Sequence, residues 1–379
     1  MIGPRLWPYV LRTVLRAPTR SALTVLGTAL ALALFAFVRT LEGGVAGISK
    51  AANRPVLVVF QQSRFCPLTS ELPLRYRADL EAMPGVQAVL PTLVYVNQCQ
   101  SNLDLVTLHG VDPASLESVQ RLRAVEGEIA GWGDVANGAL VGKRLAERRK
   151  LHVGDRARLG NVDVLVKGIV DGDGPGLDNV AFIRQEQLQL ARDIQGQTTQ
   201  FLVQLEDGAD AVALAAEIDR RFSTDEAPTD TKSMQAFVQA AVGEVAGLVT
   251  FARWLGWLAV GVVVVILGNT VFISAQTRAQ ELGTLEALGI SKSTLARALI
   301  TESLLLAITG GLLGTLAVVL WFRFVPTTLG VEGWGIDFEA GLPVFVAGLV
   351  ASVCVGLVAA IGPAIEALTR PLADAVRPI

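Results

Sequence analysis

Histidine, cysteine and charged residues are scarce in this sequence of 379 residues, which has 2 His, 3 Cys and 18% charged residues. Neither His109 nor His152 lies in an H-E-x-x-H or another known metal-binding spacing, so no metal site is predicted. The formal net charge of -3 indicates no nucleic-acid partner. The stretch GISKST, from Gly289 to Thr294, lacks the second glycine of a P-loop and does not follow a strand. We therefore predict a chain without catalytic residues or a cofactor of its own, which does not bind ATP.

The few cysteines leave one question of pairing open. Cys66 and Cys99 fall in the long middle part of the chain, where an oxidising compartment would let them form a disulfide. Two free thiols fit the sequence equally well, because sequence spacing does not give the separation of the two Cα atoms. The acidic stretch DGDGPGLDN, residues 171–179, has Pro175 where an EF-hand loop needs a ligand. A glycine-rich turn fits that stretch better.

Apolar residues dominate the chain, at 51% of all residues with a mean hydropathy of +0.49. Such a composition is too apolar for an ordinary soluble protein and predicts a membrane protein. Uncharged runs, each close to the ~20 residues that a spanning helix needs, occupy Ala22 to Val38, Leu255 to Ala275, Leu304 to Phe322 and Val344 to Ile361. The first run could instead be a signal peptide, but it exceeds the usual core of ~7–15 residues and lacks a clear small-x-small cleavage site.

About 200 residues of mixed composition separate the first run from the second, enough for an independent domain. We predict an α-helical membrane protein with four transmembrane helices and a large α+β extracytoplasmic domain inserted between the first and the second. The predicted segments are a cytoplasmic amphipathic N-terminal helix (1–20), a first span (21–45), the inserted domain (46–232), a stalk helix with the second span (233–275), a cytoplasmic coupling loop (276–302), a third span (303–322), an outer loop (323–342), a fourth span (343–362) and a cytoplasmic tail (363–379).

Lysine and arginine in the short segments set the expected orientation, because short loops rich in positive charge stay in the cytoplasm. These residues gather before the first span, between the second and third, and after the fourth: Arg5, Arg12, Arg16, Arg20, Arg278, Lys292, Arg297, Arg370 and Arg377. The loop between the third and fourth spans has Arg323 alone, offset by three acidic residues. Both termini are therefore predicted to be cytoplasmic and the inserted domain to lie outside.

Within the inserted domain, β-branched content or alternation predicts strands at 56–60, 86–96, 103–109, 157–159, 162–170 and 200–205. Helix-forming composition predicts helices at 74–82, 138–149, 185–194 and 209–222, which makes the domain α+β. From Met234 to Val249, apolar residues recur at three- and four-residue steps. No helix breaker separates them from Trp254, so we predict one long helix, capped near Ser233, that continues into the second span.

Small residues recur at four-residue spacing in the last two spans, at Gly310 and Gly314 and at Gly348, Ser352 and Gly356. Such faces let helices approach closely, and both a subunit interface and packing within one chain fit them. Asn269 is a polar residue inside the second span, and we expect it to make an interhelical hydrogen bond.

The stretch from Gln276 to Glu302 is the most informative in the chain. Leu282, Leu285 and Leu288 lie three residues apart on a predicted short helix, with Gly289 as its C-cap and Ser291 as the N-cap of the next helix. A short helix between two spans suits contact with a partner protein. An interfacial helix that rests on lipid fits the same pattern equally well.

This stretch resembles the signature of the FtsX-like, MacB-type permeases, in which a charged residue, Glu-Leu-Gly and an Ala-Leu-Gly turn lead into the next span. The matching residues are Arg278, Glu281, Leu282, Gly283, Leu285, Ala287, Leu288 and Gly289, and the pattern continues with Glu302, Gly310, Gly311 and Gly314. Other stretches that resemble the family are 16–27, 108–113, 127–128, 140–146, 151–155, 164–169 and Pro363 with Arg370 and Pro371. Many relatives have Arg where Glu128 stands here.

The resemblance implies the permease subunit of an ABC transporter, in which the matching residues form a coupling helix that docks into a separate ATPase. That ATPase binds ATP and Mg, and two copies of it join a homodimer or related heterodimer of permease subunits in the bacterial inner membrane. ATP hydrolysis then moves the extracytoplasmic domain by mechanotransmission, for export or extraction of lipoprotein, lipid, peptide or hydrophobic drug. A periplasmic adaptor is a further candidate partner. The alternative is a regulatory scaffold that activates a cell-wall hydrolase.

Overall fold

The computed structural model describes residues 7–63, 67–98, 105–172, 176–325, 327–331 and 334–369. The chain divides into two compact units. The first, here called the helical unit, comprises Met1–Gly43, Ala246–Pro326 and Phe338–Ile379. The second, the inserted domain, comprises Gly44–Val245 and Thr327–Asp337.

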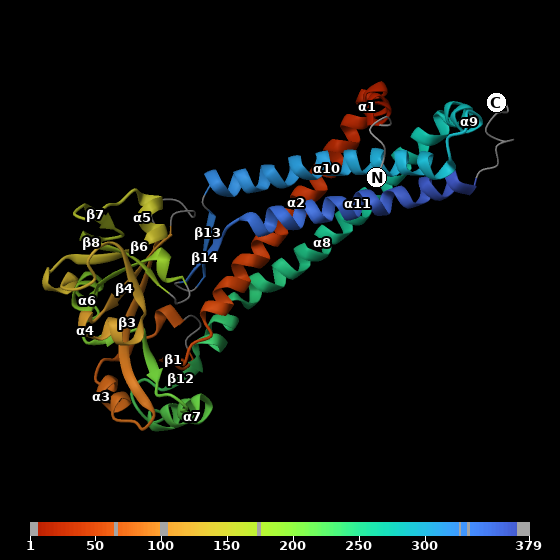
Figure 1. The fold of residues 1–379 in the computed structure, drawn as a ribbon. Coiled ribbons are helices and arrows are strands. Elements are labelled where there is room, and N and C mark those ends of the chain that lie inside the picture. Colours follow the sequence, from red (N-terminus) through yellow and green to blue (C-terminus); the bar gives the residue numbers. More distant parts are fainter. Residues whose placement is uncertain are drawn as a thin grey trace. The chain divides into compact units, whose positions relative to one another are not determined.

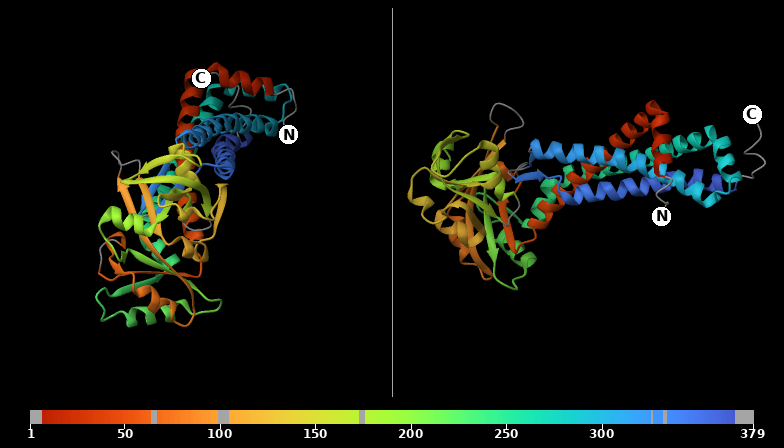
Figure 2. Two further views of the ribbon diagram at one scale, coloured as in Figure 1. Left: turned by 90° about the vertical axis from the view of Figure 1, so that its left-hand side faces the viewer. Right: turned by 45° about the horizontal axis from the view of Figure 1, so that its top comes forward.

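Within the described residues, four helices are long and apolar enough to cross a membrane. They are α2 (Pro18–Ala51), α8 (Met234–Thr277), α10 (Lys292–Phe324) and α11 (Leu342–Thr369). The two blue helices, α10 and α11, lie against each other along most of their length (Figures 1 and 2). All four helices contribute to one apolar core, for example through Ala31, Leu267, Leu306 and Ala359. With the α+β domain between α2 and α8, this arrangement confirms the predicted fold class.

The described part of the predicted N-terminal segment (1–20) contains one helix and the start of a second. Helix α1 (Trp7–Arg16) ends before Ala17, and α2 begins at Pro18. Proline lacks an amide N–H and fits the first turn of a helix but not its interior, so the chain breaks here. Val10 and Thr13 are buried, and α1 packs against α10, so one face of α1 rests on protein.

The prediction of one long helix that begins near Ser233 is confirmed. Helix α8 has 44 residues, and the Ser233 Oγ accepts a hydrogen bond of 3.2 Å from the amide N–H of Ala236. The boundary between the two units falls inside this helix, between Val245 and Ala246. The same helix therefore contributes residues to both units without a break.

A mixed ten-stranded sheet forms the inserted domain, in the order β12-β1-β11-β3-β4-β9-β6-β8-β5, with β7 beside β8. Its strands are β1 (Val56–Gln61), β3 (Val86–Gln98), β4 (Leu105–Val111), β5 (Leu122–Gly127), β6 (Gly138–Gly142), β7 (Arg156–Leu159), β8 (Val162–Gly172), β9 (Val180–Arg184), β11 (Gln200–Leu205) and β12 (Thr229–Ser233). Two further short strands, β2 (Leu72–Pro73) and β10 (Gln197–Thr198), pair with each other.

Helices cover this sheet over two hydrophobic clusters. The helices are α3 (Tyr76–Glu81), α4 (Pro113–Val119), α5 (Lys143–Arg149), α6 (Gln185–Arg192) and α7 (Ala211–Arg221), with short 3-10 turns η1 (Pro67–Thr69), η2 (Trp132–Asp134) and η3 (Leu177–Asn179). One cluster gathers β1, β3 and β11 with α3 and α7, where the rings of Tyr76 and Phe222 stack at 4.2 Å. The other gathers β4, β6, β8 and β9 with α5 and α6.

The predicted helix over 138–149 is wrong in its first half. Residues Gly138–Gly142 form β6, which is buried throughout, and only Lys143–Arg149 is helical. Because β6 lies between β8 and β9 in the middle of the sheet, its side chains show no alternation that would mark a strand. A Cβ at Gly138 would overlap the carbonyl oxygen of Trp132, so a residue with a side chain does not fit there. Strands β5, β9 and β12 and helix α4 were also not predicted.

The predicted outer loop over 323–342 contains a small sheet. Strands β13 (Thr327–Val331) and β14 (Trp334–Phe338) pair with each other between α10 and α11.

Candidate functional site

A short helix, α9 (Ala279–Ala287), connects α8 to α10 and lies in the stretch predicted to contact an ATPase. It ends in a Schellman motif, in which the amide of Gly289 donates to the Glu286 carbonyl at 2.9 Å and the amide of Ile290 to the Leu285 carbonyl at 3.1 Å. Gly289 has a φ of +92°, which glycine adopts without steric cost. The predicted N-cap position at Ser291 is confirmed, whereas the C-cap residue of α9 is Leu288 and the predicted Gly289 follows it as the left-handed residue of the motif.

A buried polar network joins the start of α9 to two spanning helices. The Arg278 guanidinium donates to Ser274 Oγ of α8 at 2.5 Å and lies 3.6 Å from Glu302 Oε1 of α10. Ser274 Oγ in turn donates to Glu302 Oε1 at 2.9 Å. The side chains of Arg278 and Glu302 are only 13% and 7% exposed. Removing one partner of such a buried pair leaves an uncompensated charge, at a cost of about 3–5 kcal/mol.

Two further ion pairs contact the same helix. Glu281 accepts two hydrogen bonds from Arg16, at the end of α1, at 2.9 and 3.1 Å. Glu286 lies 3.7 Å from Lys292 at the start of α10. An exposed pair such as Glu281 with Arg16 contributes about 0–1 kcal/mol, so the buried Arg278 network contributes more to the position of α9.

The three leucines of α9 and its C-cap lie in different surroundings. Leu282 faces inward and lines a cavity of about 50 Å³ together with Leu295 of α10, and Gly283 is buried beside it. Leu285 is half-buried, whereas Leu288 is 76% exposed. Ala287 and Gly289 are exposed as well. The outward surface of this segment is therefore its C-terminal end.

The sequence pattern predicts one common role for the eight matching residues. It does not distinguish those that face inward from those that face outward. Arg278, Leu282 and Gly283 face the helical unit, and Ala287, Leu288 and Gly289 face away from the chain. The partners Ser274 and Arg16 were not predicted for this site. One signal could have found Ser274, which precedes Arg278 by four residues and so shares its helical face.

The small residues of the last two spans lie at helix contacts within one chain. Helix α10 meets α11 and α2 through the predicted set Gly310, Gly314, Gly348, Ser352 and Gly356. A Cβ at Gly348 would overlap the side chain of Thr315 across the α10–α11 contact. A Cβ at Gly314 would overlap the carbonyl oxygen of Ala29 on α2. The helices approach here because no side chain separates them.

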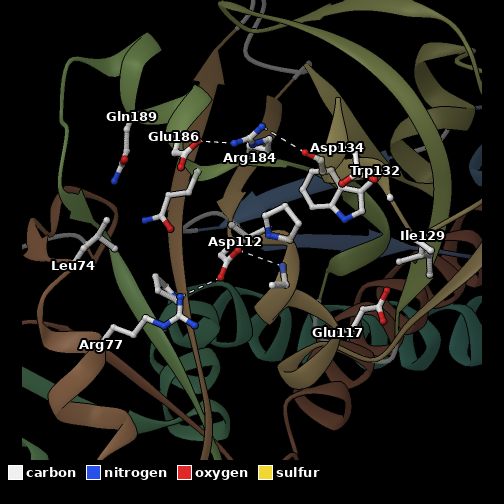
Figure 3. A pocket seen from close by; sticks show the side chains of 18 residues that line it. Leu74, Arg77, Asp112, Glu117, Ile129, Trp132, Asp134, Arg184, Glu186 and Gln189 are labelled. Atoms are coloured by element: carbon white, nitrogen blue, oxygen red, sulfur yellow. Dashed lines mark hydrogen bonds and ion pairs between the residues drawn. The ribbon is translucent and has the colours of Figure 1, made fainter. Parts of the chain in front are cut away.

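A cavity of about 820 Å³ lies in the inserted domain (Figure 3). The parallel strands β4 and β9 align Val111 with Arg184 at their carboxyl ends, and α4 and α6 begin directly after them. The carboxyl ends of parallel strands, where the following helices start, are a common location for ligand sites in α/β sheets. Sequence reasoning missed this cavity because β9 and α4 were not predicted.

Asp112, a carboxylate of this cavity, accepts hydrogen bonds from three residues. It caps α4 by accepting from the amide of Ala114 at 3.2 Å, and it also accepts from Ser115 Oγ at 2.8 Å and from Arg77 at 3.1 Å. Burial raises the pKa of the Asp112 carboxyl, but these hydrogen bonds and the Arg77 charge outweigh burial and leave the pKa below its ordinary value. The hydrogen bond to Glu81 is the main cause that raises the pKa of Arg77, which stays charged.

The predicted disulfide residues Cys66 and Cys99 lie outside the described residues. Among the residues that the structure describes, no group of three or more His, Cys, Asp or Glu could hold a metal ion. Asp178, from the acidic stretch 171–179, forms an ion pair with Arg144 at 2.7 Å.

Comparison with protein families covers both units. Residues 21–221 match the MacB-like periplasmic core domain, and residues 254–372 match the FtsX-like permease C-terminal domain. The first match alone spans more than half of the chain. The chain belongs to the MacB-type family of FtsX-like permeases. This MacB-type permease is therefore a multi-pass membrane protein and a permease subunit of the ABC transporter type, a class that is generally non-catalytic and implies an ATPase partner.

Two solved structures resemble the inserted domain of this permease at low sequence identity. The periplasmic region of MacB from Actinobacillus actinomycetemcomitans has 11% identity and a TM-score of 0.40, covering 52% of this chain and 94% of its own. The extracellular domain of the noncanonic ABC-type transporter YknZ from Gram-positive bacteria has 16% identity and a TM-score of 0.37, covering 47% of this chain and 98% of its own. The search of curated proteins gave no match.

Proposed function

We propose that this permease couples ATP hydrolysis by a separate ATPase to movement of its inserted domain outside the bacterial inner membrane. The observation that carries the proposal is α9, a short helix with an exposed C-terminal Leu288 whose base is fixed by the buried Arg278–Ser274–Glu302 network. In this proposal both termini and α9 are cytoplasmic, and the ATPase binds ATP and Mg. An exposed leucine beside a rigid helix end suits burial in a partner, because apolar burial drives most protein association.

Force applied at α9 needs a stiff path through the membrane. Arg278 joins α9 to α8 and, through Glu302, to α10, so a push on α9 acts on two spanning helices. Helix α8 continues from the helical unit into the inserted domain without a break. These contacts support mechanotransmission, in which the helices transmit movement rather than form a solute pore.

A second permease subunit, identical or related, completes the proposed assembly with two ATPase subunits. The expected bond from Asn269 to another helix of the same chain is not present among the described residues, and this amide is exposed on α8. A polar group inside a span is unfavourable against lipid and usually faces protein. A second subunit that packs on Asn269 would supply hydrogen-bond partners for this amide.

The cargo classes that the family suggests for this permease are lipoprotein, lipid, peptide and hydrophobic drug. Regulation of a cell-wall hydrolase by the moving inserted domain would use the same α9 contact. A periplasmic adaptor would be a further partner outside the membrane.

The first test is replacement of the exposed leucine, Leu288→Asp, followed by co-purification of the tagged chain from its native host in mild detergent and mass spectrometry. We expect a P-loop ATPase with the wild-type chain and at least about tenfold less with Leu288→Asp, since a charge in an interface core costs well over 1.4 kcal/mol. The matched control is Leu190→Asp, because Leu190 is 72% exposed on α6 in the inserted domain. This control should retain the ATPase.

Unchanged ATPase recovery with Leu288→Asp would show that the contact lies elsewhere. Recovery of no ATPase with the wild-type chain would instead favour a membrane receptor that works without one. A hydrolase or an adaptor in the same sample would identify the exterior partner.

A further inference from the structure

Both guanidinium groups in the wall of the 820 Å³ cavity already face carboxylates of the same wall. Arg77 lies 3.1 Å from Asp112, and Arg184 lies 2.6 Å from Glu186. Arg184 also donates to the carbonyl of Gly133. These contacts satisfy the two positive charges, so neither is available to attract an anion.

Two carboxylates of the wall remain without an ion-pair partner among the described residues. They are Glu117 on α4 and Asp134 at the end of η2, and both side chains are exposed. Figure 3 shows them on the same side of the cavity as Trp132, with Arg77 on the opposite side. The uncompensated charge on that side of the cavity is negative, which favours binding of a cation.

Gln185, the first residue of α6, adds an unpaired donor to the same cavity. Gln185 lines the cavity and is only 7% exposed, and its Nε2 has no hydrogen-bond partner in the described structure. The nearby Gln189 is different, because its Nε2 donates to the Gln197 carbonyl at 2.7 Å. A buried amide without an acceptor is unfavourable, so a carbonyl oxygen placed in the cavity by a ligand would stabilise Gln185.

The cavity wall also contains apolar surface. Pro113 of α4, Ile129 and Trp132 line the cavity, and Pro113 packs closely on Gly133. Such surface suits the methylene stem of a lysine or arginine, which packs on apolar groups while its charged end stays polar.

From this juxtaposition we propose that the cavity binds a basic segment of a polypeptide. The cationic group lies between Glu117 and Asp134, its stem packs on the apolar wall, and a backbone carbonyl accepts from Gln185 Nε2. The volume falls within the ~300–1,000 Å³ of ordinary ligand sites, which suits a short segment. The proposal goes beyond the permease function and does not depend on it, because binding requires neither nucleotide nor ATPase.

The test uses the full chain in lipid nanodiscs and a fluorescein-labelled hexapeptide of alternating lysine and alanine with blocked ends. Fluorescence anisotropy measures its Kd. We expect Glu117→Gln with Asp134→Asn to weaken binding about tenfold, equivalent to loss of two modest charge contacts, and Gln185→Met to weaken it several-fold. The control Asp207→Asn removes a charge from an exposed residue that is not part of the cavity wall and should leave the Kd unchanged.

Two further probes separate charge from the peptide backbone. The same hexapeptide with acetyl-lysine in place of lysine should bind at least about tenfold more weakly, and spermidine, which has charge but no carbonyl, should compete poorly. Any one of four results would overturn the proposal. These are equal binding of the acetylated peptide, an unchanged Kd for the double variant, strong competition by spermidine, and no binding to the wild-type chain. Thermal unfolding followed by tryptophan fluorescence confirms that each variant is folded.

Discussion

Single residues in this permease take their roles from their surroundings rather than from their type. Glu302 and Asp112 are both carboxylates held by an arginine and a serine. Glu302 is buried at 5% exposure in the helical unit and fixes α9, whereas Asp112 is partly exposed and caps α4 in the inserted domain. In both places an arginine offsets the cost of burying a polar group, because it donates to or lies beside the carboxylate.

Asp112 gives a prediction for pH dependence. Its pKa in the folded chain lies below the ordinary value, so its carboxylate stabilises the fold above the unfolded pKa of about 4, and this contribution is lost as pH falls further through the folded pKa. Asp112→Asn keeps a capping side chain but removes the charge, so it should be less stable than wild type at pH 7 and approach it below about pH 4.

The measurement is a urea titration of the full chain in mild detergent at several pH values, followed by circular dichroism. Asp112→Ala is the companion variant and should lose about 1 kcal/mol more than Asp112→Asn, because alanine does not cap a helix. A constant difference between Asp112→Asn and wild type from pH 7 to pH 3 would contradict the assigned ion pair.

Among the elements, those with a strong periodic pattern were predicted and those without one were not. The long α8 was predicted because its apolar residues recur at helical spacing across 234–249 and no breaker follows. Strand β6 was predicted as helix because a strand buried on both faces has no alternation, and Ala-Leu-Val fits either structure. The edge strand β5 is mostly exposed and carries charged residues, so it has no apolar pattern at all.

Close contact between α10 and α2 predicts a specific sensitivity to added side chains. A Cβ at Gly314 would overlap the Ala29 carbonyl, so Gly314→Ala should destabilise the helical unit by about 1–3 kcal/mol, the usual cost of overpacking. Gly362→Ala is the matched control, because a Cβ there meets nothing within 4 Å. Thermal unfolding in detergent measures both. Equal unfolding temperatures for the two variants would argue against the α2–α10 contact.

At the scale of the whole molecule, helix α8 contributes residues to both units. Its residues 234–245 belong to the inserted domain and its later residues to the helical unit. A continuous helix resists bending because each backbone hydrogen bond spans one turn. We expect nucleotide-driven movement at α9 to reach the inserted domain along this helix.

A break in α8 should therefore uncouple ATP hydrolysis from movement of the inserted domain. Gly243→Pro removes a helical hydrogen bond and costs ~3 kcal/mol or more in a helix interior. The control is Gly243→Ala, which improves helix propensity. A Cβ at this position meets nothing within 4 Å, so alanine fits there. In the complex with the ATPase, Gly243→Pro should keep ATP hydrolysis but reduce the ATP-dependent change in hydrogen exchange of the inserted domain. Gly243→Ala should behave as wild type. A full response in Gly243→Pro would mean that α8 is not the path.

The sequence by itself determined the four spans, the inserted α+β domain, the long α8 and the family motif of the stretch 276–302, because each depends on local composition or spacing. Tertiary structure decided which of the matching residues face inward, since Leu282 and Leu288 have the same residue type and differ only in what packs on them. It also brought Ser274 and Glu302 to Arg278, and Gln185, Glu117 and Asp134 to one cavity. Contacts between distant parts of a chain depend on strand order and helix packing, which no local pattern encodes.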